Sequence, residues 1–193
     1  QVYNVVASAS ICIALGMDSN LVFKSLGYLK PARGRMEVLS ETKNNGLVII
    51  DYAHTPDALK SALKSIQQIT NRGRIITLFG CGGDRDKHKR QIMGELADKY
   101  SDLVIVTDDN PRNETPSNIR KEILDGCPSA TEIPNRNKAI KYAVSKLEKD
   151  DLLLIAGKGH ETFQAIGTET LPFDDYTVAK EALKNIEKSG VIH

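Results

Sequence analysis

Acidic, amide and guanidinium side chains stand together in one short stretch of the chain, Thr107-Asp108-Asp109-Asn110-Pro111-Arg112. The apolar run 103–106 before it indicates a buried strand, and ligands of parallel sheets bind where strands end. Asp109 and Asn110 can hold an ammonium or a carboxylate group. Pro111 stiffens the loop, and Arg112 offers a planar fork for a carboxylate. This 107–112 loop therefore favours an amino acid ligand, although a polar turn that caps a helix has a similar composition.

A second loop combines glycines with cations, Gly80-Cys81-Gly82-Gly83-Asp84-Arg85-Asp86-Lys87-His88-Lys89-Arg90. Closely spaced glycines let the backbone turn its N–H groups toward an anion, and four cations surround them, Arg85, Lys87, Lys89 and Arg90. Neither a P-loop nor a dinucleotide fingerprint is present, and glycine-rich turns also form for purely steric reasons. The cations favour an anionic ligand for this 80–90 loop, and Arg85 is the best candidate to bind a carboxylate.

Two further polar loops follow predicted strands. In the 51–57 loop, Asp51 can bind ribose hydroxyls and His54 can face a nucleotide; equally, both side chains can satisfy loop backbone. In the 156–161 loop, Gly157 permits a close backbone approach and Glu161 can pair with a substrate ammonium. Four polar loops after four apolar strands predict one pocket, whose two arginines and several acceptors suit a zwitterion. The sequence shows no Ser-His-Asp arrangement and no Cys/His spacing typical of a metal site.

Strand and helix patterns alternate from Arg35 onward, which predicts an α/β domain around a mostly parallel sheet. The expected strands are residues 36–41, 47–51, 74–79, 103–106, 131–133 and 152–156, with a turn at 44–46 and a late hairpin formed by 162–166 and 169–173. The expected helices are residues 56–70, 88–100, 117–124, 137–149 and 175–188.

The first thirty or so residues have a different pattern. Residues 4–16 are apolar nearly all round, as in a helix covered on several sides, and a shorter helix is expected to end at Leu26. Two such helices bury too little to form a domain, so we interpret 1–31 as the end of a preceding domain and 32–193 as a second domain. Because the chain opens on Gln1, without an initiator Met, we expect it to be a piece of a longer protein.

The composition is ordinary for a globular protein, with 40% hydrophobic and 26% charged residues among 193. A net charge of +1 favours neither nucleic acid nor membrane as a partner, and no apolar run approaches the roughly 20 residues that span a bilayer. The three cysteines, Cys12, Cys81 and Cys127, suit packing roles in a reducing cytosol. We therefore expect a cytoplasmic protein without a metal site.

Five motifs follow one another along the chain: Gly34-Arg35-Met36-Glu37, Asp51-Tyr52-Ala53-His54-Thr55-Pro56-Asp57, Gly82-Gly83-Asp84-Arg85-Asp86, Asp109-Asn110-Pro111-Arg112 and Gly157-Lys158-Gly159-His160-Glu161. In this order and spacing they closely resemble the carboxy-terminal part of the Mur ligase family, the ATP-dependent ligases of peptidoglycan synthesis. The resemblance implies a Rossmann-like domain that binds the incoming amino acid, preceded by two helices left over from a central ATPase domain.

The resemblance also implies roles for single residues. The motif Asp109, Asn110, Pro111 and Arg112 is similar to the one that selects meso-diaminopimelate, and further amino-acid-binding positions match Arg85, Gly157 and Glu161. The positions where relatives approach the adenosine part of ATP match Asn4, Arg35, Asp51 and His54. The chemistry agrees, because diaminopimelate differs from lysine by a distal carboxylate. Arg112 and Arg85 supply forks for that group, and a buried fork that lysine leaves unpaired is costly.

In the family, ATP phosphorylates the D-glutamate carboxylate of UDP-N-acetylmuramoyl-L-alanyl-D-glutamate, and the diaminopimelate amine attacks the acyl phosphate. The resemblance gives this chain the task of holding that amine in line, without a catalytic residue of its own. The family's phosphate-binding loop, magnesium ligands and UDP site are missing from the sequence. We therefore expect ATP and Mg²⁺ to act in a full-length enzyme, neither to bind tightly here, and the isolated chain to have no ligase activity.

Two other functions stay open. One is a stand-alone amino-acid-binding module without a catalytic partner. It differs from part of a ligase in whether the natural gene continues upstream into an ATPase domain. The other is a lysine-adding ligase, which Arg112 disfavours.

Overall fold

The computed structural model describes residues 2–40, 46–69 and 73–189 of the chain. The chain divides into two compact units, Gln1–Ala32 and Arg33–His193, each with its own set of internal contacts. The turn predicted at 44–46 falls largely outside the described residues.

The first unit is a pair of helices, α1 (Val2–Ala14) and α2 (Ser19–Leu26), as the sequence pattern predicts. Asp18 caps α2, because its Oδ1 accepts the backbone N–H of Leu21 at 2.9 Å. Many apolar side chains of this unit are uncovered, and Tyr3 is 91% exposed and Leu15 80%. Across the described residues, no helix combines the length and the apolar character that crossing a membrane requires.

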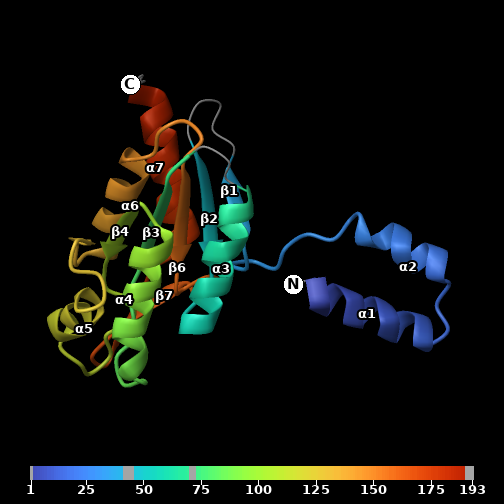
Figure 1. Cartoon of the computed structure of the whole chain (residues 1–193), viewed down its shortest axis with the longest axis horizontal. Helices are drawn as coiled ribbons and strands as arrows, with labels where there is room; N and C mark the ends of the chain where they lie inside the picture. The colour runs from blue at the N-terminus through green and yellow to red at the C-terminus, as the bar shows by residue number, and fades with distance from the viewer. Residues whose placement is uncertain (1, 41–45, 70–72, 190–193) are drawn as a thin grey trace. The chain divides into compact units, whose positions relative to one another are not determined.

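The second unit is built on a six-stranded sheet with the order β1-β2-β6-β3-β4-β5 (Figure 1). Its strands are β1 (Glu37–Ser40), β2 (Leu47–Asp51), β3 (Ile75–Phe79), β4 (Leu103–Val106), β5 (Thr131–Glu132) and β6 (Leu152–Ala156). Neighbouring strands pair in parallel except β1, which runs antiparallel to β2. Every residue of β3 and β6 is buried, which explains their almost continuously apolar sequences.

Among the described residues, five helices cover the two faces of this sheet (Figure 1). One face carries α3 (Pro56–Ile69), α4 (His88–Tyr100) and α5 (Pro116–Leu124), and the other carries α6 (Arg136–Ser145) and α7 (Asp175–Ser189). Alternate strand residues supply the two cores, because successive side chains of a strand point to opposite faces. Ile49 and Leu154 belong to the first core, and Ile50 and Leu153 to the second. The predicted α/β fold around a mostly parallel sheet is confirmed.

The largest difference from the predicted elements concerns α6. The sequence pattern predicts a helix over 137–149, whereas α6 begins at Arg136 and ends at Ser145. It ends early because the Asp151 carboxylate accepts the backbone N–H of Glu148 at 3.0 Å and that of Arg74 at 2.9 Å. These bonds tie the segment before β6 to the start of β3 in place of a last helical turn.

Beyond β6, β7 (Phe163–Ile166) and β8 (Glu169–Pro172) form a separate antiparallel hairpin at the predicted position. Gly167 occupies its turn with φ +58°, a conformation that glycine adopts without a steric cost. All four residues of β8 are exposed, so the hairpin adds little to the hydrophobic cores. Strand β7 lies beside the 107–112 loop, through a parallel bridge between Arg112 and Ile166.

A buried ion pair joins the two helices of the second face. Arg136 begins α6, Asp175 begins α7, and both side chains are 0% exposed. Two guanidinium nitrogens of Arg136, Nε and Nη2, each donate to the Asp175 carboxylate at 2.7 Å. Nη2 also donates to the carbonyl of Ala156 at 3.1 Å. The pair therefore fixes both helix starts at the carboxyl end of β6.

Candidate functional site

One pocket of about 590 Å³ opens at the carboxyl ends of the parallel strands. The loops after β2, β3, β4 and β6 all contribute to its wall, which is the convergence that four polar loops after four apolar strands predict. The residues predicted to bind the amino acid that line it are Arg85, Asp109, Asn110, Arg112, Gly157 and Glu161. Pro111 is buried and does not line the pocket. The structure brings these residues together, and their roles in binding stay predictions.

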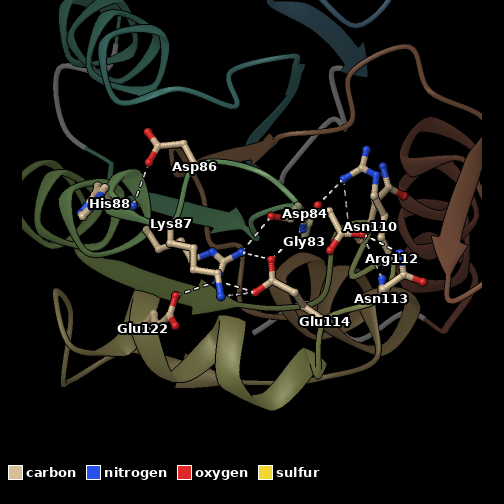
Figure 2. Close-up of polar contacts among 12 residues, drawn as sticks. Gly83, Asp84, Asp86, Lys87, His88, Asn110, Arg112, Asn113, Glu114 and Glu122 are labelled. Carbon is tan, nitrogen blue, oxygen red and sulfur yellow. Dashed lines mark hydrogen bonds and ion pairs between the residues drawn. The ribbon is translucent and has the colours of Figure 1, made fainter.

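The two predicted arginines lie beside the same glycine, although they come from different loops. A Cβ atom placed on Gly82 would lie 2.8 Å from Arg112 Nη1 and 3.8 Å from Arg85 Cγ, so both side chains flank this glycine. Arg112 Nη1 donates to the carbonyl of Gly83 at 2.9 Å and to that of Asn110 at 3.4 Å (Figure 2). Within the described part of the chain, Arg112 Nη2 and Nε have no hydrogen-bond partner. Part of the guanidinium fork is thus not used in bonds with these residues.

Asn110 orients the acidic side of the pocket. Its Oδ1 accepts from Lys158 Nζ at 2.9 Å and from the Ala165 N–H at 3.0 Å, so both lone pairs of the amide oxygen are used. Its Nδ2 donates to Glu161 Oε2 at 2.9 Å. The amide oxygen is therefore not available for an ammonium, contrary to the expectation from the sequence. Glu161 Oε1 is bonded to none of the described residues, so this oxygen keeps a free acceptor position in the wall of the pocket.

Lys158 belongs to this arrangement and escapes prediction from the sequence. Its side chain is 0% exposed, and its Nζ bonds Asn110 and lies 3.3 Å from Glu161 Oε2. A buried ammonium is tolerated only when it is paired, so Lys158 and Glu161 depend on each other. The sequence signal is weak, because a Lys between two glycines has little specificity. Its position just after a fully apolar strand is the one available clue.

Two glycines are required by close packing between loops. The N–H of Gly83 donates to the Asn110 carbonyl at 2.9 Å, and a Cβ at Gly83 would meet the Pro111 carbonyl oxygen at 1.9 Å. Gly157 has φ +114°, and a Cβ there would lie 2.7 Å from Asp109 Oδ2. The N–H of Gly83 is thus used within the protein and not for an anion. Of the two explanations for the glycine-rich sequence, the steric one applies at this residue.

Two of the four cations in the 80–90 loop are paired within the protein. Arg90 is 0% exposed, and its guanidinium bonds Glu114 at 2.9 and 3.0 Å and Glu122 at 2.6 Å. Lys87 Nζ lies 3.3 Å from Glu114 Oε2 (Figure 2). We correct the expectation that Arg90 and Lys87 offer positive charge to a ligand, because the two glutamates neutralise them. Of the four cations, Arg85 and Lys89 line the pocket.

Glu114 connects the 80–90 loop to the start of α5. Its carboxylate bonds Arg90, accepts the backbone N–H of Asp84 at 2.6 Å and pairs with Lys87. The bond to Arg90 lowers the pKa of Glu114 from its ordinary 4.5 to about 2, with smaller contributions from Asp84 and Lys87. A depressed folded-state pKa stabilises the fold above the unfolded pKa, and that stabilisation is lost as the pH falls.

Glu114→Gln is therefore expected to lose stability relative to wild type at pH 6, and the difference should shrink as the pH falls from about 4.5 toward about 2. The measurement is urea denaturation of both proteins at a series of pH values. Glu169→Gln, on the exposed strand β8, is the matched control and should follow the wild type throughout. A wild-type–variant difference that does not change with pH would contradict the assigned pKa.

The residues predicted near adenosine are distributed differently. His54 lines the pocket, whereas Arg35 and Asp51 do not, and Asn4 belongs to the first unit. Arg35 lies over the Tyr52 ring, 4.7 Å from its centroid, and the His54 ring is 4.5 Å from the same ring. Burial raises the pKa of Asp51, although its carboxylate accepts the Met36 N–H at 2.7 Å. These four positions stay predictions for the nucleotide.

The two buried thiols are poorly suited to nucleophilic chemistry. Cys81 and Cys127 are buried, and burial raises the pKa of Cys81 to about 12 and that of Cys127 to about 11. At neutral pH both are protonated and poor nucleophiles. No group of three or more His, Cys, Asp or Glu side chains in the described ranges is placed to hold a metal ion.

Fold and pocket together define a class, a Rossmann-like α/β domain whose strand-end pocket presents both cations and carboxylates to a small ligand. The chain belongs to the Mur ligase family, because the family described as "Mur ligase, glutamate ligase domain" matches residues 34–159. The resemblance inferred from the five motifs is thereby confirmed.

Two relatives of this chain share the same name. The chain is 48% identical over 191 residues to a UDP-N-acetylmuramoyl-L-alanyl-D-glutamate–2,6-diaminopimelate ligase of Agrobacterium fabrum, and 48% identical over 187 residues to the ligase of that name from Zymomonas mobilis. These matches cover 99% and 95% of this chain but 39% and 38% of the relatives. The chain thus spans about two-fifths of the length of the relatives it matches.

Solved structures of ligases are also similar to this chain. A structure of a UDP-N-acetylmuramoyl-L-alanyl-D-glutamate–2,6-diaminopimelate ligase is 35% identical with a TM-score of 0.75, and the match covers 96% of this chain and 38% of that one. The UDP-N-acetylmuramate-alanine ligase of Thermotoga maritima has a TM-score of 0.71 at 20% identity, over 97% of this chain and 38% of that one. At that identity the second likeness shows the fold alone.

Proposed function

We propose that this chain is the amino-acid-binding part of an ATP-dependent ligase that adds meso-diaminopimelate to UDP-N-acetylmuramoyl-L-alanyl-D-glutamate in peptidoglycan precursor synthesis. The observation that carries the proposal is one pocket lined by Arg85, Arg112, Asp109 and Glu161. The names of the relatives support it, since they contain both of these substrates.

The chemistry of the ligand matches the charges of the pocket. Diaminopimelate has an amino group and a carboxylate at each of its two ends. The guanidinium forks of Arg85 and Arg112 suit the carboxylates, and Asp109 and Glu161 suit an ammonium. Lysine lacks the distal carboxylate, so a partly desolvated fork would stay unpaired in its complex. In ligation, the chain contributes by holding the attacking amine in line with the acyl phosphate.

In this scheme, other parts of the ligase bind the phosphates of ATP, Mg²⁺ and the UDP-linked substrate. The described residues offer no cluster that fits a metal ion, so no step is assigned to Mg²⁺ on this chain. Residues 1–31 complete the central ATPase domain, which covers apolar side chains such as Leu15. The residues from 32 onward form the amino-acid-binding domain, in a cytoplasmic enzyme.

Isothermal titration calorimetry tests this function. meso-Diaminopimelate titrated into the 193-residue chain is expected to bind with one-to-one stoichiometry, and L-lysine under the same conditions to bind far more weakly. Lysine binding without diaminopimelate binding would assign the chain to a lysine-adding ligase. No binding of either amino acid would refute the proposed ligand class.

The chain by itself is expected to form no peptide bond, because the groups that bind the ATP phosphates are assigned to other parts of the ligase. The measurement is product formation from UDP-N-acetylmuramoyl-L-alanyl-D-glutamate, meso-diaminopimelate, ATP and Mg²⁺. A complete ligase of the family, assayed in parallel, is the positive control. ATP-dependent product formation by the 193-residue chain would contradict this division of roles.

A further inference from the structure

Among the described residues, the β7–β8 hairpin is bonded to the 107–112 loop and forms a sheet separate from the main one. The N–H of Arg112 donates to the Ala165 carbonyl at 3.1 Å, and the N–H of Gly167 donates to the Arg112 carbonyl at 2.7 Å. The N–H of Ala165 donates to Asn110 Oδ1 at 3.0 Å. Strand β7 thus pairs with the loop that carries the predicted ligand-binding residues, and the loop acts as a short third strand beside the hairpin.

Gln164 supplies one more bond, from its side chain. Its Nε2 donates to the backbone carbonyl of Asp109 at 2.6 Å, directly before Asn110. Gln164 is half-buried on a strand whose other residues are exposed or half-buried, and it belongs to neither hydrophobic core. It does not line the pocket. A substitution at Gln164 therefore removes a bond to the loop without leaving a cavity in the core.

Arg112 needs this support because its φ is +50°, in the left-handed region that residues with a Cβ adopt at an energetic cost. Its N–H and its carbonyl both bond the hairpin, and its Nη1 bonds the Gly83 carbonyl on the other side. Arg112 is thereby held both by its backbone and by its guanidinium group. Any change that frees the backbone of the 107–112 loop lets Arg112 relax and moves its fork.

We propose that the β7–β8 hairpin holds the 107–112 loop of the pocket in place, and that Gln164 is a positioning residue that acts on the ligand through Arg112. The inference rests on the proposed function, in which Arg112 binds the distal carboxylate of diaminopimelate. It adds to that function a residue that touches no ligand itself and lies in a different segment of the chain.

The test is a double-mutant cycle in the 193-residue chain, read by calorimetric titration of meso-diaminopimelate. Gln164→Ala is expected to weaken binding by about five- to tenfold, the effect of one hydrogen bond to a functional loop. In an Arg112→Ala background the same change is expected to weaken binding by less than about twofold, because the residue it positions is gone. Thr170→Ala, on exposed β8 opposite Ala165, is the matched control and should bind as the wild type does.

Three results would overturn the inference in distinguishable ways. If the wild type does not bind diaminopimelate, the proposed function and this inference both fail. If the wild type binds and Gln164→Ala binds equally well, only the inference fails. If Gln164→Ala loses the same factor in both backgrounds, the hairpin supports the pocket without acting through Arg112. Equal thermal unfolding midpoints of wild type and Gln164→Ala show that the loss of affinity does not come from unfolding.

Discussion

Arg112→Ala is expected to weaken the binding of meso-diaminopimelate by more than about 2 kcal/mol, or roughly 30-fold in Kd. The substitution removes a planar fork from a pocket wall and leaves the distal carboxylate of the ligand desolvated and unpaired. It also removes the bond from Nη1 to the Gly83 carbonyl, so part of the loss comes from the position of the loop. Calorimetric titration of the variant and the wild type measures the difference.

Two controls separate these contributions. Arg112→Lys keeps the charge but not the fork, and its affinity should fall between those of the wild type and the alanine variant. Arg33→Ala removes an exposed arginine that pairs with Asp174, and it should leave the affinity unchanged. An Arg112→Ala variant that binds as tightly as the wild type would show that the 107–112 loop is a polar connection before α5 and not a binding element.

Asp175→Asn is expected to destabilise the fold by about 3–5 kcal/mol, because it leaves the guanidinium of Arg136 buried without a carboxylate. Both side chains are fully buried, so no solvent replaces the lost partner. The Arg136 Nη1 atom already has no partner among the described residues, which increases the dependence on Asp175. Urea denaturation at neutral pH measures the change in the free energy of unfolding.

The neighbouring residue gives a matched control. Asp174→Asn alters an ion pair with Arg33, whose side chain is 51% exposed, and it should cost less than about 1 kcal/mol. Replacing both buried partners, Arg136→Met with Asp175→Leu, should recover much of the loss, since no charge is then left unpaired. If Asp175→Asn alone costs less than about 1 kcal/mol, Arg136 either finds another partner or does not depend on the Asp175 carboxylate for its stability.

The position of the pocket followed from the sequence because it depends on a general property of parallel sheets. Polar loops after 47–51, 74–79, 103–106 and 152–156 must emerge at one edge, so their residues had to meet. Arg85 and Arg112 follow two of these strands, so both were expected at this edge whatever their side-chain contacts. The element boundaries were also accessible, except where a contact from a distant part of the chain, such as that of Asp151 with Arg74, accompanied an early helix end.

The sequence did not predict in the same way which charged side chains face the pocket and which are paired within the protein. Arg90 and Lys87 stand beside glycines like ligand-binding cations, yet Glu114 and Glu122, from the next loop and helix, neutralise them. Lys158 meets Asn110 across 48 residues of sequence, so its burial has no local signal beyond its position just after the fully apolar strand β6. Which charges face a ligand depends on which partners the fold supplies, and spacing along the chain does not record those partners.

A crystal structure of the chain with meso-diaminopimelate tests the proposed site most directly. We expect one carboxylate of the ligand between the guanidinium groups of Arg85 and Arg112, and an ammonium within hydrogen-bond distance of Glu161. Density for the ligand elsewhere, or a bound ligand whose carboxylates both avoid Arg112, would contradict the assignment of this pocket.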